Sequence, residues 1–309
     1  MNPALQWLAV APEVAAAVAA GRPVVALETT LVTHGLPHPR GLATAASLEA
    51  QVRAEGAVPA TIGVLRGRVR VGMTAPEIEE LAAAAGTLKL NPSNLAAQVA
   101  RGGPGSTTVG ATMLVAAHAG IPVFATGGIG GVHREATETG DVSADLYALA
   151  RHRVAVVCAG AKAVLDLPRT VELLESLGVP IYGLGTDELP AFYRRASGLR
   201  LDARFDDLAA LAAAVRVHFA LGPGSGVVVG NPIPAAHELP AAIYEPALAH
   251  ALVDAAGQGV RGRAVTPFLL ERLRDLTGGA SVTANVALLE HNARVAARLA
   301  RALAGRSQS

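Results

Sequence analysis

Short apolar runs rich in β-branched residues alternate along the chain with longer segments rich in Ala and Leu. The short runs predict strands at 24–27, 61–65, 69–71, 123–125, 154–158, 181–183 and 227–229. The longer segments repeat apolar residues every three or four positions, which predicts helices at 42–54, 75–84 and 171–177. Arg66-Gly67-Arg68 predicts a tight turn between two strands, and the chain from 241 onward is predicted to be mostly helical with a break at 277–279.

The predicted strands are apolar throughout, and most are followed by glycines and then by a helix. This pattern is typical of a parallel sheet that is covered on both faces. We therefore expect an α/β fold, a three-layer α/β/α sandwich with a mainly parallel sheet and a helical C-terminal third. The chain contains no repeat, no low-complexity linker and no shift in composition, so we expect a single domain over 1–309.

Composition narrows the class of protein further. Apolar residues make up 51% of the 309 residues but aromatic residues only 3%, so Ala, Val and Leu must build the core. This aliphatic content excludes an intrinsically disordered chain. A formal net charge of +1, without a long basic run, argues against a nucleic-acid partner.

The sequence predicts a cytoplasmic protein that does not enter a membrane. The longest stretch without a charged side chain, 102–132, is interrupted by Pro104, Pro122 and many small polar residues, unlike a membrane-spanning helix. The N-terminal segment lacks the basic start of a signal peptide and carries Glu13 within its apolar run. Cys158 is the single cysteine, so no internal disulfide can form, as expected in a reducing compartment.

Chemically informative residues follow several of the predicted strands. Glu28-Thr29-Thr30, the run TGGIGG at 126–131, Ala159-Gly160-Ala161-Lys162 and Gly230-Asn231-Pro232 all occupy such positions. In open α/β sheets ligands bind at the carboxyl ends of the strands. We therefore expect these segments to converge on a ligand site.

Lysine usage singles out two positions. Of 26 basic residues only Lys89 and Lys162 are lysines, and the rest are arginines. An amine can lose its proton and attack a carbonyl carbon, whereas a guanidinium cannot. Lys162 follows an apolar strand, where desolvation favours the neutral amine that Schiff-base chemistry needs. The alternative is a structural ion pair with Asp166, one turn further on.

Two groups of acids also have alternative interpretations. Glu28 ends an apolar strand, where burial can raise its pKa and make it a general acid, or it caps the following turn. In Asp141-Val142-Ser143-Ala144-Asp145 the first carboxylate is either a helix N-cap or a ligand that holds Mg²⁺ or Mn²⁺ together with waters.

Other polar residues give weaker indications. His34, His38 and His133 lack metal-ligand spacing, so we interpret them as polar pocket or surface residues. The run TGGIGG lacks the spacing of a dinucleotide-binding loop, because His133 stands where its third glycine would be. Glycines after a strand more often let backbone N–H groups approach an oxyanion or a phosphate.

Eight collinear strings carry a family resemblance over about residues 12–300. They are LETTLVTHGLPHP (27–39), STTVGATM (106–113), VFATGGIGGVHR (123–134), DVSADL (141–146), VVCAGAKAVLDLP (156–168), GNPIP (230–234), TPFLL (266–270) and TGGASVTAN (277–285). Together they resemble the pseudouridine-5′-phosphate glycosidase family.

The resemblance implies an enzyme that reversibly cleaves the C–C glycosidic bond of pseudouridine 5′-phosphate to uracil and ribose 5-phosphate. This glycosidase reaction is formally grouped with the carbon–oxygen lyases. It also implies an α/β/α fold, a homotrimer and one divalent metal per subunit, usually Mn²⁺. The matching positions make Glu28 the proton donor, Lys162 the nucleophile and Asp141 the metal ligand. Lys89, Val109 and the run Ser143-Ala144-Asp145 match substrate-contacting positions.

The residue types suit this chemistry. An amine can trap C1′ of a ring-opened ribose as an iminium, while Glu28 supplies the proton that opens the ring. The chain departs from the family after Lys89, where Leu-Asn-Pro-Ser-Asn at 90–94 replaces a segment with two arginines and an acid, and at His38, where many relatives have an aromatic residue. These departures bear on phosphate affinity or the trimer contact, and on the shape of the loop over the site. Two alternative functions stay open: a related C-glycosidase or Schiff-base lyase that acts on another base or sugar phosphate, and a non-catalytic sugar-phosphate-binding module.

Overall fold

The computed structural model describes residues 6–162 and 164–305. In these ranges eleven strands form one sheet, in the order β1-β4-β3-β2-β7-β8-β11-β9-β10, with β6 paired to β3 and β5 paired to β6. The strands are β1 (Leu8–Val10), β2 (Val24–Glu28), β3 (Val58–Leu65), β4 (Arg68–Val71), β5 (Leu88–Leu90), β6 (Gly105–Thr107), β7 (Val123–Ala125), β8 (Ala155–Cys158), β9 (Ile181–Leu184), β10 (Ala203–Phe205) and β11 (Val227–Gly230). Among them, the β3–β4 and β3–β6 pairs are antiparallel and the other pairs are parallel.

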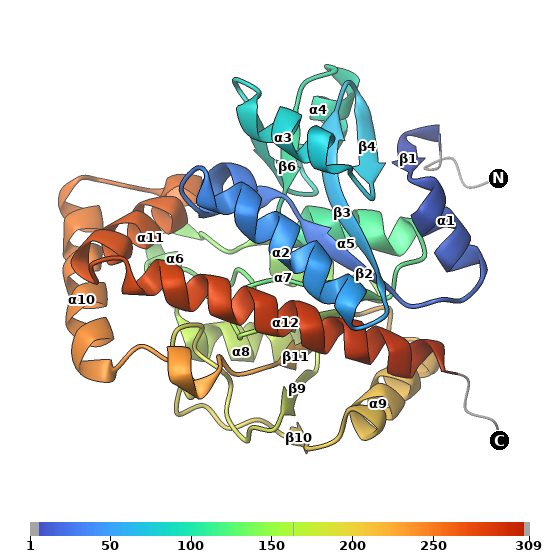
Figure 1. Ribbon diagram of the computed structural model, residues 1–309. Coiled ribbons are helices and arrows are strands. Elements are labelled where there is room, and N and C mark those ends of the chain that lie inside the picture. The colour runs from blue at the N-terminus through green and yellow to red at the C-terminus, as the bar shows by residue number, and fades with distance from the viewer. Residues whose placement is uncertain (1–5, 163, 306–309) are drawn as a thin grey trace.

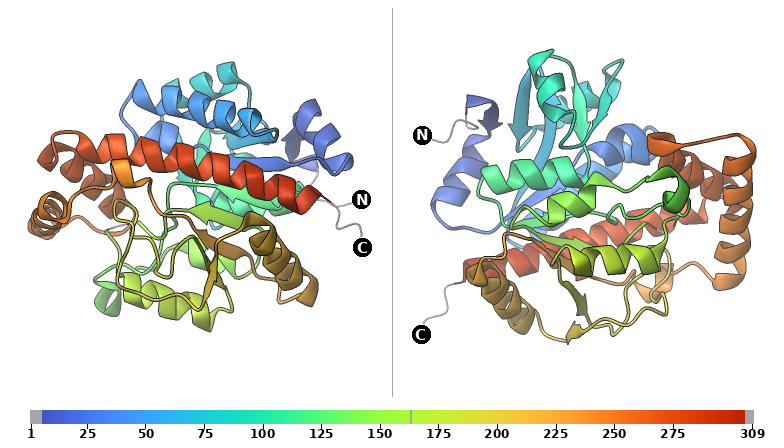
Figure 2. Two further views of the ribbon diagram at one scale, coloured as in Figure 1. Left: turned by 60° about the horizontal axis from the view of Figure 1, so that its bottom comes forward. Right: turned by 180° about the vertical axis from the view of Figure 1, so that it is seen from behind.

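The helices cover both faces of this sheet. They are α1 (Pro12–Ala19), α2 (Arg40–Ala54), α3 (Ala75–Ala83), α4 (Leu95–Ala100), α5 (Val109–His118), α6 (Ala136–Thr139), α7 (Ala144–Leu149), α8 (Leu167–Ser176), α9 (Leu208–Leu221), α10 (Ala241–Gly257), α11 (Val265–Leu276) and α12 (Ala280–Ala304), with a π-helical turn η2 (Leu31–Gly35) and two 3₁₀ turns, η3 (Ala235–His237) and η4 (Gly262–Ala264). Figure 1 shows α2 and α12 on the face of the sheet that is turned toward the viewer. The right view of Figure 2, seen from behind, shows α5, α7 and α8 on the opposite face. The predicted three-layer α/β/α architecture is confirmed.

Each predicted strand and helix is present, with ends that differ by a few residues. The strand predicted at 61–65 begins earlier, at Val58, and the helix predicted at 171–177 is α8. The predicted turn joins β3 to β4, because Arg66 (φ 52°) and Gly67 (φ 71°) both take the left-handed conformation that a two-residue hairpin loop needs. The C-terminal third is helical, and the expected break falls before α12, where Gly279 is also left-handed.

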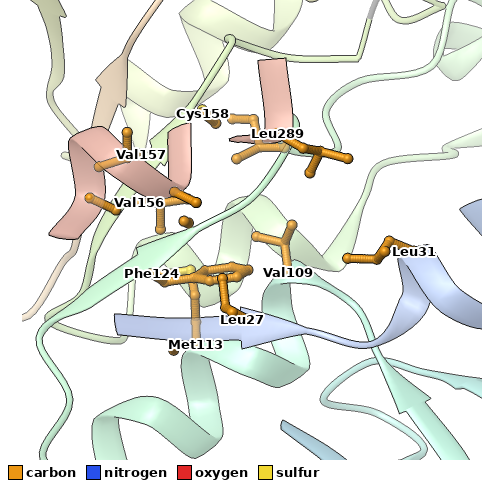
Figure 3. Packing of buried hydrophobic residues seen from close by; sticks show 14 of the residues in the cluster. Leu27, Leu31, Val109, Met113, Phe124, Val156, Val157, Cys158 and Leu289 are labelled. Atoms are coloured by element: carbon orange, nitrogen blue, oxygen red, sulfur yellow. The ribbon is translucent and has the colours of Figure 1, made fainter. Parts of the chain in front are cut away.

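The core lies where the central strands meet α5 and α12. β2, β7 and β8 are buried along their whole length, as expected for parallel strands that are covered on both faces. Figure 3 shows the aliphatic and aromatic side chains gathered there, with Phe124 of β7 near Leu27 of β2 and Met113 of α5. Among the described helices, none has both the length and the apolar character that crossing a bilayer requires.

Candidate active site

The carboxyl ends of three neighbouring strands bring the predicted catalytic residues together. β7 lies between β2 and β8, and all three run parallel. Glu28 is the last residue of β2, Thr126 follows β7, and Lys162 lies four residues beyond β8. Glu28, Thr126, Lys162 and Lys89 line one hollow, which we name the Glu28 chamber. Three of the four segments expected to converge, 28–30, 126–131 and 159–162, therefore meet at this edge, whereas Gly230-Asn231-Pro232 does not line the chamber.

A second hollow adjoins the first. It has a volume of about 190 Å³, and Asp141, Ser143, Ala144, Asp145 and Thr108 line it, so we name it the Asp141 chamber. Lys89, Lys162 and Thr266 line both chambers. The two lysines therefore stand where the chambers meet, and one ligand can extend from one chamber into the other.

Glu28 has the environment of a protonated acid. Its carboxyl group is buried, and this burial raises its pKa, although the nearby Lys162 ammonium and a hydrogen bond from Thr126 oppose the rise. The Thr126 hydroxyl donates to Oε1 of Glu28 at 2.5 Å. Glu28 is therefore suited to donate a proton near neutral pH.

Backbone hydrogen bonds fix the position of Lys162, and the residue lines both chambers. Its N–H donates to the carbonyl of Ile129 at 3.0 Å, and the Ile129 N–H donates to the carbonyl of Gly160 at 3.1 Å. The alternative ion pair with Asp166 is not formed in the described residues. The Asp166 carboxylate caps α8 by accepting from the Arg169 N–H at 3.1 Å, and it lies 3.5 Å from Nε of Arg169.

The acids of the Asp141 chamber have distinct roles. Ser143, not Asp141, is the N-cap of α7, since its hydroxyl accepts from the Asp145 N–H at 3.2 Å. The capping interpretation of Asp141 is therefore wrong. Asp145 is buried and accepts from the N–H groups of Gly110 and Gly130, each at 2.8 Å, so its carboxylate ties α5 to the loop after β7.

In the described part of the chain, Asp141 lines the Asp141 chamber and makes no capping hydrogen bond to α7. Its side chain is 30% exposed, and its Oδ2 lies 3.9 Å from Nδ1 of His133, whose pKa burial lowers. The part of the chain that the structure describes contains no cluster of three or more His, Cys, Asp or Glu side chains arranged to hold a metal ion. A divalent ion here would take one carboxylate and complete its coordination with waters, as Mg²⁺ and Mn²⁺ commonly do.

The N-terminus of α5 faces the Asp141 chamber. Thr108, its N-cap residue, lines the chamber, and its buried hydroxyl oxygen has no hydrogen-bond partner among the described residues. Val109 begins the helix, so its N–H has no acceptor within α5. Val109 itself does not line the chamber: its side chain is buried in the core, and only its backbone N–H, next to Thr108, can meet a ligand. These donors and the helix dipole favour an anion.

The glycine run after β7 is required mainly for close packing. A Cβ atom on Gly128 would lie 2.6 Å from the Phe192 ring and 2.9 Å from the Gly160 carbonyl oxygen. The N–H of Gly130 is already bonded to Asp145 and that of Ile129 to Gly160. These two amides are therefore used within the protein and are not aimed at an oxyanion.

Some lining residues were given no catalytic or binding role from the sequence, although His34 was interpreted as a polar pocket or surface residue. His34 lines the Glu28 chamber from the π-helical turn η2, Thr266 reaches both chambers from α11, and Asn285 comes from α12. The strings LETTLVTHGLPHP, TPFLL and TGGASVTAN each contain one of these three residues. Nothing in the sequence alone places α11 and α12 beside β2.

An amine and a buried carboxyl group in one cavity, with a helix N-terminus at the adjoining one, define an α/β enzyme that acts on a small molecule. The chain belongs to the family of indigoidine synthase A like proteins, whose model matches residues 13–302.

Curated relatives and solved structures agree with this assignment. A protein of Methylobacterium nodulans called pseudouridine-5′-phosphate glycosidase is 54% identical over 97% of this chain and 89% of its own length. A protein of the same name from Caldanaerobacter subterraneus is 48% identical over 96% of both chains. The prealnumycin C-glycosynthase AlnA, solved in complex with ribulose 5-phosphate, has a TM-score of 0.89 and is 41% identical over 97% of both chains. An indigoidine synthase A-like protein of Thermotoga maritima has a TM-score of 0.87 and is 33% identical over 96% of both chains.

Proposed function

We propose that this enzyme reversibly cleaves the C–C glycosidic bond of pseudouridine 5′-phosphate to give uracil and ribose 5-phosphate. The observation that carries the proposal is the placement of Lys162 and the buried Glu28 in one chamber. Curated relatives that are about half identical over nearly the whole chain bear the name of this activity.

The residues of the Glu28 chamber account for the bond cleavage. Glu28 donates its proton to the ribose ring oxygen as the C1′–O bond breaks, and the Lys162 amine bonds to C1′. The new secondary ammonium returns a proton to Glu28, which then protonates C5 of uracil. The C1′–C5 electron pair leaves with uracil while the nitrogen lone pair forms the C1′=N iminium. Water finally hydrolyses the iminium.

The Asp141 chamber suits the phosphate end of the substrate. The Thr108 hydroxyl, the Val109 N–H and the Lys89 ammonium provide donors and positive charge, and Ser143 and Ala144 line the same wall. Asp145 orders this wall through its bonds to Gly110 and Gly130. Asn91 and Asn94 also line it, so the 90–94 segment contributes two neutral amide residues to this wall.

We also propose that Asp141 holds one divalent ion per subunit, most simply Mn²⁺, with waters as the remaining ligands. A bound ion would offset negative charge and orient water. A homotrimeric assembly, which the family resemblance implies, and a cytoplasmic location, which the single cysteine supports, complete the proposal.

A direct assay tests the function. Pseudouridine 5′-phosphate should be converted to uracil, whereas uridine 5′-phosphate, which has a C–N bond, should not. Lys162→Arg keeps the positive charge but cannot form an iminium, so it should release no uracil. Uracil release by Lys162→Arg at the parental rate would refute the proposal.

A second activity is favoured by one specific observation. The similar structure AlnA is a C-glycosynthase. The alternative is therefore a related C-glycosidase or Schiff-base lyase that acts on another base or sugar phosphate through the same lysine. Failure to cleave pseudouridine 5′-phosphate, together with a borohydride-trapped adduct from ribose 5-phosphate on Lys162, would favour it.

A further inference from the structure

His34 is a titratable side chain of the Glu28 chamber that the steps above do not use. It lies in η2, the π-helical turn that begins three residues after β2, and π-helical turns are frequent at functional sites. Its imidazole lines the chamber together with Glu28, Lys89 and Lys162. The fold therefore places a potential base within the chamber where the iminium forms.

Two hydroxyl groups fix the imidazole through one nitrogen. Oγ1 of Thr33 lies 2.6 Å from Nδ1 of His34, and Oγ of Ser106 lies 3.3 Å from the same nitrogen. The Thr33 hydroxyl donates its single proton to Ser106 Oγ at 2.7 Å, so its lone pair accepts from Nδ1–H. Nε2 is then the unprotonated nitrogen, available to a ligand as a base.

The surroundings move the pKa values of His34 and Glu28 in opposite directions. Burial and the positive charge of Lys89 lower the pKa of His34, whereas burial raises the pKa of Glu28. Two titratable groups in one cavity whose pKa values are moved apart in this way form an acid–base pair. Their surroundings therefore favour the protonated form of Glu28 and the neutral form of His34.

We propose that His34 is the base that activates water for hydrolysis of the Lys162 iminium, an inference that rests on the proposed function. Nε2 takes a proton from water as the water oxygen bonds to C1′, and the C=N π pair returns to nitrogen. The imidazolium gives that proton to the nitrogen of the carbinolamine. Nε2 then takes the hydroxyl proton while the carbonyl forms and the C–N pair leaves with Lys162. The imidazolium finally gives its proton to the Glu28 carboxylate, which restores the starting acid.

The test separates uracil release from hydrolysis. His34→Gln should release one equivalent of uracil per subunit in a burst and then turn over about 10²–10⁴-fold more slowly, because loss of a general base slows only the later step. A short pulse of borohydride during turnover should label Lys162 in a larger fraction of subunits than in the parent, whose label approaches one sugar phosphate per subunit only on prolonged exposure. His118→Gln is the matched control: His118 is exposed at the far end of the ten-residue helix α5, so this variant should show the parental rate and no burst.

Thr33→Val provides a second variant, since it keeps the imidazole but removes the acceptor of Nδ1–H. It should show the same burst with a smaller loss of steady-state turnover. Parental turnover without a burst in His34→Gln and Thr33→Val would overturn the inference, as would slow uracil release without accumulation of adduct. Absence of uracil release by the parent would instead refute the proposed function itself.

Discussion

Glu28 is a residue whose chemistry depends on its surroundings more than on its type. It lies at the end of a fully buried strand, and its carboxyl group accepts a hydrogen bond from Thr126 and senses the charge of Lys162. Burial nevertheless dominates and favours the neutral form. The same burial that favours the protonated form of Glu28 therefore opposes folding once the group ionises.

Glu28→Gln should separate these two consequences. The variant should lose about 10²–10⁴-fold in kcat, because an amide cannot donate the proton. Since the folded parent binds this proton more tightly than the unfolded chain, the parent loses stability as pH rises from the ordinary carboxyl pKa to the raised one. The variant should therefore gain stability relative to the parent as pH rises across that range, as measured by urea unfolding at several pH values. Equal pH dependence of the two proteins would contradict a raised pKa.

Asp141 allows a similar test at the other chamber. Asp141→Ala should retain the parental melting temperature, because Ser143 and not Asp141 caps α7. It should lose the activity that manganese restores to the chelated parent. Isothermal titration with Mn²⁺ measures the binding directly. Full activity of the variant after chelation would remove Asp141 as the metal ligand.

At the scale of elements, α12 positions the loop that follows β7. Nδ2 of Asn292 donates to the carbonyl of Thr126 at 2.8 Å, and Nδ2 of Asn231 donates to Oδ1 of Asn292 at 2.8 Å. Both amides are buried. The pair joins α12 to the ends of β7 and β11, and it fixes the backbone from which the Thr126 hydroxyl reaches Glu28.

Asn292→Leu should therefore act on Glu28 through Thr126. Loss of the hydrogen bond from Thr126 raises the pKa of Glu28 further, so the alkaline limb of the kcat–pH profile should move to higher pH. Thr126→Val should produce the same movement, and adding Asn292→Leu to it should produce no more. Additive movements in the double variant would show that Asn292 acts by another route.

The β8 loop before Lys162 depends on a glycine that no other residue can replace. Gly160 has φ 82°, and a Cβ atom there would lie 1.8 Å from the Pro190 carbonyl oxygen. Gly224 has a similar φ of 89° with no atom within 4 Å of its Cβ position.

Gly160→Ala should consequently destabilise the protein more than Gly224→Ala does. The control should lose about 1–2 kcal/mol of unfolding free energy for the left-handed backbone alone. Gly160→Ala should lose roughly a further 1–3 kcal/mol because of the clash. Urea unfolding of both variants measures the difference, and equal losses would contradict the close approach of Pro190.

The elements that the sequence predicted well are those with a strong local pattern. β2, β7, β8 and β11 are continuous apolar runs, so their existence and their polar ends were predictable. β5 (LKL) and β6 (GST) are three residues long, and their strand conformation depends on pairing with each other and with β3. Lys89 therefore reaches the site from a strand that no local pattern indicates.

At the scale of the whole molecule, the site depends on strand order. The neighbours β2, β7 and β8 are far apart in the chain, and their parallel pairing brings Glu28, Thr126 and Lys162 to one edge. α11 and α12 then close the same edge with Thr266 and Asn285. The sequence indicated which strand ends carry chemistry, whereas the order of the strands and the helices above them arises from long-range packing.

The covalent role of Lys162 is the central claim, and borohydride trapping tests it most directly. Borohydride is added while the protein turns over pseudouridine 5′-phosphate, and the digested protein is analysed by mass spectrometry. We predict one reduced sugar phosphate per subunit, on the peptide that contains Lys162. With only Lys89 as another lysine, the assignment is unambiguous among side-chain amines. A label on Lys89, or turnover by the parent without any label, would contradict the account.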